Sequence, residues 1–254
     1  MSWDPRQYLA FAGHRLRPVL DLLARIPAEA PARVVDLGCG AGNGTKILRQ
    51  TWPDSALTGV DNSPEMLARA RDESPDIDWV EADIGAWRPP EPVDVLFSNA
   101  ALHWLDGHET LFPALARQVA KDGYFAMQIP ANFRAPSHIL IDDVAREGPW
   151  RDRLAGIVRD PPTKLPGFYY DLLAPIAQDL DIWEIEYLQV LEGDDPVAEF
   201  TKGSWLPQFL EPLDDDERLE FETDYRARLR EAYPKRSDGT TLFPFRRLFT
   251  VAKM

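Results

Sequence analysis

The chain has 254 residues, of which 44% are hydrophobic and 28% are charged. This is ordinary globular composition with enough apolar material for a sizeable core, and at about 150 residues per domain the length indicates one large domain or one domain with insertions. The formal net charge of −14 argues against a protein that neutralises the phosphates of DNA or RNA, so we expect no nucleic-acid partner.

The acidic charge is concentrated in one segment. Residues 179–224 hold 16 Asp and Glu against two bases, Lys202 and Arg218, so this segment accounts for the net −14 and the rest of the chain sums to zero. Residues 226–254 are instead basic, with eight Lys and Arg against two acids. Acidic stretches of this kind are usually solvated faces, which is how we interpret residues 179–224.

Cys39 is the only cysteine, which excludes an intrachain disulfide and a thiolate metal cluster and suits a reducing compartment. The four histidines show no metal-ligand spacing, so no metal is expected. The amino-terminal residues lack the apolar core of a signal peptide, and no apolar run approaches the ~20 residues of a membrane span. We therefore expect a cytoplasmic protein with no membrane partner.

Amphipathic periodicity predicts a helix over residues 5–26, with a break at Pro18. Strand and helix patterns then alternate. Strands are predicted at residues 33–37, 56–60, 77–81, 93–98 and 123–129, and helices at 45–52, 64–71 and 109–120. This alternation predicts an α/β fold, a Rossmann-like doubly wound sheet that is mostly parallel.

Beyond residue 130 the pattern loosens. Further strands are predicted at residues 181–191 and 242–252, antiparallel at the sheet edge, and the residues between them are mostly helical, including 214–233. We interpret these helices as lid insertions in a single domain spanning residues 1–254. Its expected parts are a helical cap (1–26), a cofactor-binding core (33–129) and a substrate side (130–254).

The strongest motif is VVDLGCGAGN at residues 34–43, a strand that ends in closely spaced glycines and leads into a helix. Such glycines let a ligand approach the backbone and the free amides at the helix start. A dinucleotide fingerprint G-x-G-x-x-G would need glycine at position 43, but that residue is Asn43 and the third glycine is Gly42. Taken alone, the motif is also compatible with a simple tight turn.

Polar residues also follow the next three strands. Asp61 closes the second strand, where a carboxylate can accept both hydroxyls of a ribose, and Ser63 is better placed than Asp61 to cap the following helix. EADI places Asp83 after the third strand, and SNAALHW follows the fourth. Because open α/β sheets bind ligands at the carboxyl ends of their strands, four such loops in order predict one ligand site.

These motifs resemble those of class I S-adenosylmethionine-dependent methyltransferases. With the amino-terminal WDPRQYLAFAGHRLRP and the later segments YYDLL, DIWEIEY and RLFTVAK, the chain resembles the trans-aconitate 2-methyltransferase family along its whole length. The resemblance implies S-adenosyl-L-methionine as cofactor, S-adenosyl-L-homocysteine as product and methyl transfer to a carboxylate of trans-aconitate, a small anionic tricarboxylate. We expect a monomer or a weak homodimer.

The resemblance also assigns cofactor contacts. It implies that Asp83 hydrogen-bonds the adenine amine and that the backbone of Ile84 reads the ring edge. Trp87 is a candidate shield for the adenine, with core packing as the alternative. The expected cofactor-binding residues are Asp36, Gly38, Gly40, Gly42, Asn43, Asp61, Asn62, Asp83, Ile84, Ser98 and Asn99.

No general base is assigned, because a carboxylate with a pKa near 4 is already ionised at pH 7. The chemistry instead needs the acceptor oxygen, the methyl carbon and the sulfur held in line, with water excluded. We expect His103 and Trp104 to be the positioning residues, with the ring face of Trp104 favouring the sulfonium.

A tricarboxylate substrate requires cations, and arginines fit planar carboxylates best. Arg246 and Arg247 point to opposite faces of a strand, and the resemblance favours Arg247. Each arginine is also compatible with a surface ion pair, and each tyrosine with packing. The expected substrate-binding residues are Tyr8, Arg15, Arg134, Tyr169, Tyr170 and Arg247.

Three alternatives remain. The chain could use the same cofactor to methylate another small molecule. It could bind the cofactor without turnover and dock a basic partner through residues 179–224. A nicotinamide oxidoreductase is the third alternative, which Asn43 disfavours.

Overall fold

The computed structural model describes residues 16–254, so the predicted site residues Tyr8 and Arg15 and the first half of the predicted helix 5–26 lie outside the described residues. The chain forms two compact units. The first comprises Met1–Ile129, Lys164–Ile185 and Leu248–Met254, and the second comprises Pro130–Thr163 and Glu186–Arg247. The expectation of a single domain spanning residues 1–254 stays a prediction.

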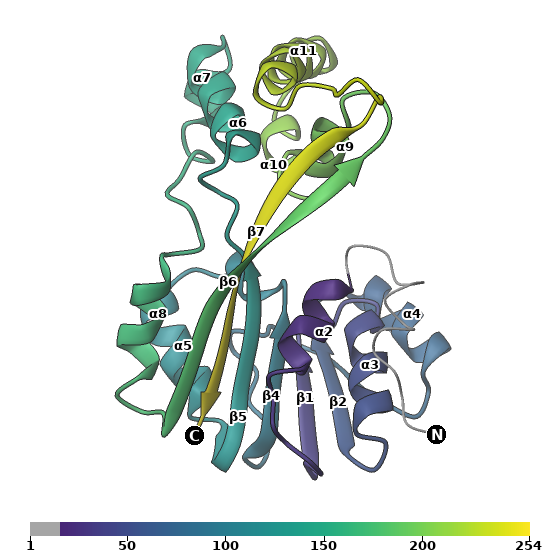
Figure 1. The fold of residues 1–254 in the computed structure, drawn as a ribbon, viewed down its shortest axis with the longest axis vertical. Coiled ribbons are helices and arrows are strands. Elements are labelled where there is room, and N and C mark those ends of the chain that lie inside the picture. Colours follow the sequence, from purple (N-terminus) through teal and green to yellow (C-terminus); the bar gives the residue numbers. More distant parts are fainter. Residues whose placement is uncertain (1–15) are drawn as a thin grey trace. The chain divides into compact units, whose positions relative to one another are not determined.

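The first unit is built on a seven-stranded sheet with the strand order β3-β2-β1-β4-β5-β7-β6 among the described residues (Figure 1). Strands β1 to β5 pair in parallel with their neighbours in this order. The strands are β1 (Arg33–Leu37), β2 (Ala56–Asp61), β3 (Asp78–Glu81), β4 (Val93–Asn99), β5 (Val119–Pro130), β6 (Asp179–Leu191) and β7 (Thr241–Lys253).

The last strand runs against the others. The end of β7 meets the start of β5, because Asp122 N donates to Met254 O at 2.7 Å and Met254 N donates to Gly123 O at 2.9 Å. Gln178 N, just before β6, donates to Lys253 O at 2.7 Å, so β7 is also antiparallel to β6. The predicted doubly wound, mostly parallel sheet with antiparallel pairing at one edge is therefore confirmed.

Helices of the first unit begin where the sequence supplies a start signal. Pro18, Pro64 and Pro166 lie in the first turns of their helices, where the missing amide costs nothing. The helical elements of this unit are α2 (Arg17–Leu23), α3 (Asn43–Thr51), α4 (Pro64–Glu73), η1 (Leu102–Trp104), α5 (His108–Ala116) and α8 (Pro166–Leu173).

The predicted helix 109–120 is too long. Helix α5 ends at Ala116, and β5 begins at Val119, four residues before the predicted strand 123–129. Val119 pairs with Val93 across a register shift in β4, so sheet pairing prevails over the helical periodicity of residues 117–120.

The second unit has a helical core. Its helices are α6 (Pro136–Glu147), α7 (Arg151–Leu154), α9 (Pro196–Lys202), α10 (Pro207–Leu210) and α11 (Asp215–Ala232). Phe209, Phe221 and Tyr225 are fully buried in this core. Helix α11 begins with a capping box between Asp214 and Glu217, which confirms the helix predicted over residues 214–233.

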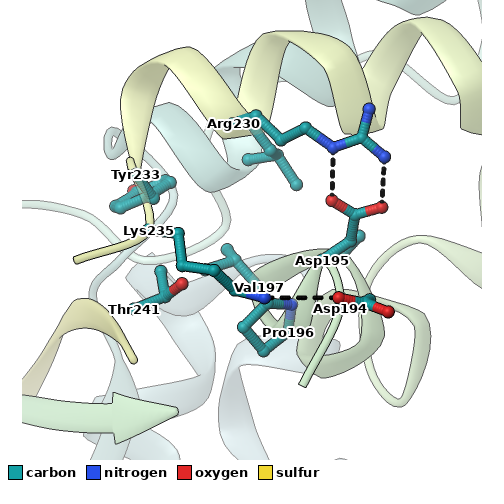
Figure 2. A pocket seen from close by; sticks show the side chains of 10 residues that line it. Asp194, Asp195, Pro196, Val197, Arg230, Tyr233, Lys235 and Thr241 are labelled. Atoms are coloured by element: carbon teal, nitrogen blue, oxygen red, sulfur yellow. Dashed lines mark hydrogen bonds and ion pairs between the residues drawn. The ribbon is translucent and has the colours of Figure 1, made fainter. Parts of the chain in front are cut away.

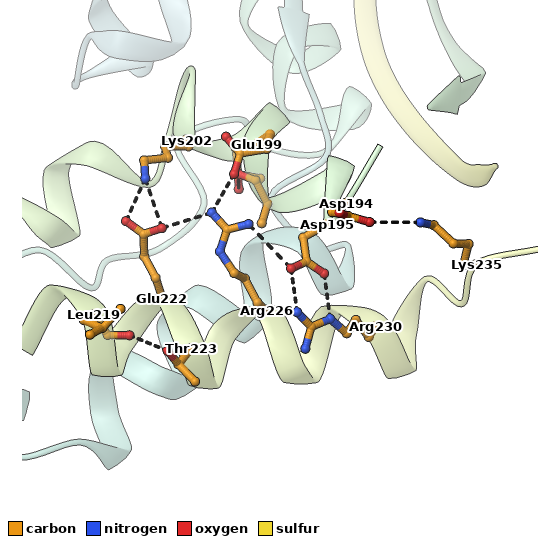
Figure 3. Close-up of polar contacts among 12 residues, drawn as sticks. Asp194, Asp195, Glu199, Lys202, Leu219, Glu222, Thr223, Arg226, Arg230 and Lys235 are labelled. Carbon is orange, nitrogen blue, oxygen red and sulfur yellow. Dashed lines mark hydrogen bonds and ion pairs between the residues drawn. The ribbon is translucent and has the colours of Figure 1, made fainter. Parts of the chain in front are cut away.

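The acidic and basic segments pair with each other within the second unit. Asp195 accepts two hydrogen bonds from Arg230, at 2.7 and 2.6 Å, and lies 3.6 Å from Arg226 (Figure 3). Arg226 also bonds Glu199 and Glu222. Part of the acidic segment is therefore a network of ion pairs with α11.

A cavity of about 320 Å³ lies beside this network (Figure 2). Two of its lining bases, Arg230 and Lys235, are each paired with a neighbouring aspartate. The charges of these two bases are therefore already compensated, and we assign the network a structural role.

Candidate functional site

A second cavity, of about 500 Å³, lies in the first unit, where β1, β2 and β4 end. Its walls come from the loops predicted to bind a ligand. The described lining residues are Gly38, Gly40, Asp61, Asn62, Ser63, Met66, Asp83, Ile84, Ala100, Ala101, Trp104 and Leu105. Six of the expected cofactor residues and Trp104 therefore lie around one cavity.

The glycine loop has the conformation that its sequence requires. Gly38 has φ +81°, and a Cβ there would lie 2.1 Å from the Ala101 Cβ. Gly40 has φ +54°, and a Cβ there would meet no atom within 4 Å. The backbone at Gly38 thus packs tightly against the loop after β4, while the backbone at Gly40 borders open space.

Gly42 and Asn43 are not among the described residues that line the cavity. Gly42 is the left-handed N-cap of α3, and a Cβ there would collide with the Trp79 ring at 2.6 Å. Asn43 is the exposed first residue of α3. Both support the helix that follows the loop, and their expected contact with cofactor stays a prediction.

Asp61 is held by backbone amides on both oxygens. Gly40 N donates to Oδ2 at 2.8 Å, and Ser63 N donates to Oδ1 at 2.9 Å. Ser63, not Asp61, caps α4, because its hydroxyl accepts from Met66 N, as the sequence predicts. Each Asp61 oxygen keeps a further lone pair for a ligand hydroxyl.

Asp83 is the second carboxylate in the lining. Its Oδ1 accepts from Gly85 N at 2.7 Å, and the neighbouring side chains Ile84 and Leu105 are apolar. A carboxylate beside apolar side chains can accept from an amine on a flat ring while the ring itself packs against the apolar part. Trp87 is half-buried and is not among the described residues that line this cavity.

Three expected cofactor residues have buried polar atoms. Asp36 is buried and accepts from Thr45 Oγ1 at 2.6 Å, and burial raises the pKa of Asp36 to about 7. Ser98 is fully buried and donates to Leu37 O at 2.7 Å. Asn99 Oδ1 is buried and has no hydrogen-bond partner among residues 16–254. These positions support the loops, and their direct contact with a cofactor stays a prediction.

The segment after β4 carries the two expected positioning residues. His103 is buried, whereas Trp104 is 49% exposed and lines the cavity. Their rings lie 4.7 Å apart. Ala100, which also lines the cavity, has φ +55°, a strained conformation for a residue with a side chain.

Several lining residues carry no sequence signal. Met66 lies on α4 and is 41% exposed, and Ala101 packs against the position of the missing Gly38 side chain. Neither methionine nor alanine differs at these places from an ordinary core or surface residue. The half-exposed Met66 and Trp104 do mark apolar surface that a ligand would cover.

The expected substrate residues belong to both units. Arg134 is exposed and Arg247 is half-buried, both in the second unit. Burial lowers the pKa of Arg247 to about 10, and its guanidinium lies 4.9 Å from the Phe245 ring centre. In the first unit Tyr170 is exposed, whereas Tyr169 is fully buried and bonds His108 at 3.0 Å. Their contact with substrate stays a prediction.

The cavity in the first unit fits S-adenosylmethionine. Among its described lining residues are two carboxylates, Asp61 and Asp83, and no basic side chain. The carboxylates suit the ribose hydroxyls and the adenine amine as acceptors, and the apolar residues suit the ring. The acidic lining also favours a ligand with net positive charge, because carboxylates in a partly desolvated site attract a cation and repel an anion strongly.

Within residues 16–254, no group of three or more His, Cys, Asp or Glu side chains is arranged to hold a metal ion. No helix among these residues is both long and apolar enough to span a bilayer.

Strand order, parallel pairing and a cavity at the carboxyl ends of the strands define a class I S-adenosylmethionine-dependent methyltransferase fold. Residues 34–123 match the family described as "Methyltransferase domain". A solved S-adenosylmethionine-dependent methyltransferase from Mesorhizobium loti has a TM-score of 0.53 at 23% identity, covering 95% of this chain and 99% of that one. Phosphoethanolamine N-methyltransferase 2 from Haemonchus contortus, solved with S-adenosyl-L-methionine, has a TM-score of 0.54 at 15% identity, covering 93% and 52%. These likenesses establish the fold.

Sequence relatives define the family more narrowly. The chain is 46% identical over 251 residues to trans-aconitate 2-methyltransferase of Azoarcus sp. (strain BH72), covering 99% of this chain and 98% of the relative. It is also 46% identical over 263 residues to the protein of that name from Streptomyces coelicolor, covering 99% and 86%. The chain belongs to the trans-aconitate 2-methyltransferase family.

Proposed function

We propose that this chain transfers the methyl group of S-adenosylmethionine to one carboxylate of trans-aconitate, forming a monomethyl ester and S-adenosylhomocysteine. The observation that carries the cofactor assignment is the acidic cavity of the first unit, with Asp61 and Asp83 and no basic side chain among its described lining residues. Family membership supports the acceptor, because the relatives are named for trans-aconitate.

The charge of the cavity distinguishes between cofactors. S-adenosylmethionine carries a sulfonium and an ammonium against one carboxylate, so it is a net cation at pH 7. A nicotinamide dinucleotide carries a pyrophosphate, which needs amides and cations around it. Asn43 in place of the third fingerprint glycine points the same way, so an oxidoreductase is disfavoured.

We assign the cofactor contacts to the chain's own residues as follows. The Gly38–Gly40 loop allows close approach, Asp61 accepts the ribose hydroxyls, and Asp83 and Ile84 receive the adenine. Bound S-adenosylmethionine supplies a methyl group on an electron-poor sulfur. Asp36, Gly42, Asn43, Asn62, Ser98 and Asn99 complete the proposed set.

The protein's catalytic task is positioning. The acceptor carboxylate is already ionised at pH 7, so no side chain has to remove a proton from it. Trp104, exposed on the cavity wall, would cover the reacting region and exclude water, and the buried His103 beside it would fix its orientation.

Arginines are proposed to bind the acceptor. A half-buried guanidinium such as that of Arg247, whose pKa burial lowers, gains more from an incoming carboxylate than a fully solvated one. Arg134 and Tyr170 are exposed and accessible to substrate. Tyr8 and Arg15 complete the proposed substrate set, whereas the Tyr169 hydroxyl is buried and bonded to His108, so this proposal gives it no contact with substrate.

The setting of the enzyme is proposed from composition. Cys39, the single cysteine of the chain, is buried and suits a reducing cytoplasm. The net charge of −14 favours a protein with no nucleic-acid partner. We propose a monomer or a weak homodimer with no membrane partner.

Ligand binding tests the cofactor assignment separately from the acceptor. In a thermal-unfolding assay, S-adenosylhomocysteine should raise the melting temperature and NAD should not, because only a ligand of the native state stabilises it. A panel of small acids, alcohols and amines then identifies the acceptor. Stabilisation by NAD alone would contradict the proposed function, while transfer to a different acceptor would preserve the cofactor and change the substrate.

A further inference from the structure

We infer that His108 and Tyr169 are positioning residues that hold one wall of the cofactor cavity, an inference that rests on the proposed function. The wall consists of Trp104 and Leu105, at the end of η1 and just after it. His108 is the first residue of α5, and Tyr169 lies on α8. All of these residues belong to the first unit.

The contact between them is a continuous chain of hydrogen bonds. Lys164 N donates to Tyr169 Oη at 3.1 Å, Tyr169 Oη lies 3.0 Å from His108 Nδ1, and His108 Nε2 lies 3.0 Å from Leu102 O. His108 is 3% exposed and Tyr169 is 0% exposed. The chain therefore links α8 through α5 to the first residue of η1, out of contact with solvent.

The direction of each bond follows from the chemistry of the partners. A carbonyl oxygen only accepts, so His108 Nε2 must carry the proton that faces Leu102 O. In the neutral ring Nδ1 is then an acceptor, and Tyr169 must donate to it. Burial lowers the pKa of His108 and raises that of Tyr169 to about 12, so both groups keep these protonation states near neutral pH.

Leu102 O is the point at which the wall is fixed. The same oxygen accepts from Leu105 N at 3.2 Å, which closes the turn of η1. His108 therefore bonds the oxygen that also holds the turn together. Ala101, immediately before this turn, packs against Gly38. Trp104 at its end is 49% exposed, and its ring lies 4.7 Å from the ring of the buried His103.

Packing around the pair keeps the geometry rigid. The Phe112 ring lies 4.8 Å from the His108 ring and 4.9 Å from the Tyr169 ring. These aromatic contacts exclude water that would otherwise compete for the hydrogen bonds. The Tyr169 hydroxyl, expected from the sequence to bind substrate, is already engaged in this chain.

Two amide substitutions at position 108 separate the two ends of the chain. The side-chain amide of Gln reaches the place of Nε2 and can still donate to Leu102 O, whereas that of Asn reaches only the place of Nδ1 and can meet only Tyr169. If the bond to Leu102 positions the wall, His108→Gln should bind S-adenosylhomocysteine within about twofold of wild type, and His108→Asn should bind about fivefold more weakly. Tyr169→Phe should weaken binding by a similar or smaller factor.

The matched control is Tyr225→Phe. Tyr225 is also fully buried and bonds Thr201 and Ser137, but it belongs to the second unit. The Tyr225→Phe variant should lose thermal stability as Tyr169→Phe does, but calorimetry should show wild-type affinity for S-adenosylhomocysteine. Equal affinities for His108→Asn and His108→Gln, or an equal loss in Tyr225→Phe, would overturn the inference.

Hydrogen exchange in the ligand-free protein distinguishes this inference from the proposed function. Amides of residues 102–106 should exchange faster in His108→Asn than in His108→Gln, whatever the cofactor. If wild type binds no S-adenosylhomocysteine, the proposed function fails while this readout still tests the wall. Unchanged exchange in both variants would leave the wall without a positioning role for His108.

Discussion

Gly40 N donates a 2.8 Å hydrogen bond to Asp61 Oδ2, joining the glycine loop after β1 to the end of β2. Ser63 N holds the other oxygen at 2.9 Å. The carboxylate is therefore fixed before any ligand arrives, and it presents its remaining lone pairs to the cavity. Preorganisation of this kind reduces the ordering that ligand binding would otherwise require.

Replacing Asp61 should weaken cofactor binding more than it weakens the fold. In Asp61→Asn one oxygen becomes an amide that donates and cannot accept, so one ribose hydroxyl loses its partner and one loop amide is opposed by another donor. We expect the dissociation constant of S-adenosylhomocysteine, measured by calorimetry, to rise about tenfold or more.

Asp94→Asn is the matched control for that change. Asp94 also accepts from two backbone amides, Ala32 N at 2.7 Å and Arg33 N at 2.8 Å, but it lies at the start of β4, away from the cavity. It should lose comparable stability and keep wild-type affinity. Equal loss of affinity in both variants would mean that Asp61 acts only through the fold.

The two glycines that line the cavity should respond differently to alanine. Gly38→Ala places a Cβ 2.1 Å from that of Ala101 at φ +81°, so we expect a loss of about 2 kcal/mol or more in the free energy of unfolding. Gly40→Ala has open space, so it should cost only about 1 kcal/mol for its positive φ but should obstruct the ligand. Denaturant unfolding and calorimetry on both variants separate these effects; a Gly40→Ala protein with unaltered affinity would place the ligand elsewhere.

Asp36 predicts a pH dependence of stability. Burial raises its pKa from 3.8 to about 7, so between these values the unfolded chain ionises at Asp36 while the folded chain keeps its proton. Folding stability from this group is therefore highest at acid pH and falls as pH rises towards 7, by about 3–4 kcal/mol at ~1.4 kcal/mol per pKa unit. The free energy of unfolding of Asp36→Asn, compared with that of wild type at the same pH, should therefore increase by about 3–4 kcal/mol between pH 4 and pH 8. Denaturant unfolding measures this difference.

Asp195→Asn is the reference variant, because the pKa of Asp195 is shifted in the opposite direction to that of Asp36. Hydrogen bonds from Arg230 lower the pKa of Asp195, so its stabilisation is present above its ordinary pKa and is lost only as pH falls below it. Its variant should be less stable than wild type by about 1 kcal/mol, with little change between pH 5 and pH 8. A flat difference for Asp36→Asn over the same range would show that Asp36 is solvated or paired in the folded protein.

Arg247 and its neighbour test the substrate assignment. Arg247 is half-buried, whereas Arg246 is exposed and pairs with Glu186 at 3.4 Å. We expect Arg247→Gln to raise the KM for trans-aconitate at least tenfold without changing the affinity for S-adenosylhomocysteine, and Arg246→Gln to leave both unchanged. An unchanged KM in Arg247→Gln would remove this residue from the substrate site.

The sheet could be predicted from the sequence because its signals are local. Alternating strand and helix patterns, the glycine loop and Pro64 each act within a few residues, and they gave the parallel core and the position of Asp61. The predicted end of α5 was wrong because residues 117–120 fit a helix locally, whereas the pairing of Val119 with Val93 is a contact between distant residues across the sheet.

The site was predicted less completely for the same reason. Charged and glycine residues are recognisable one at a time, but Ala101 matters only because it packs against Gly38, and Met66 only because α4 brings it to the cavity. The Tyr169 hydroxyl was expected to face substrate, and its bond to His108 joins residues 61 positions apart. No periodicity or spacing in the sequence encodes such a contact.

Methyl transfer tests the central claim most directly. The purified chain is incubated with S-adenosylmethionine labelled on the methyl group and with trans-aconitate, and the product is treated with mild base. We expect label in a small acidic product, released by base as methanol, with one S-adenosylhomocysteine formed for each ester. Stoichiometric cofactor binding without label on trans-aconitate would contradict the account.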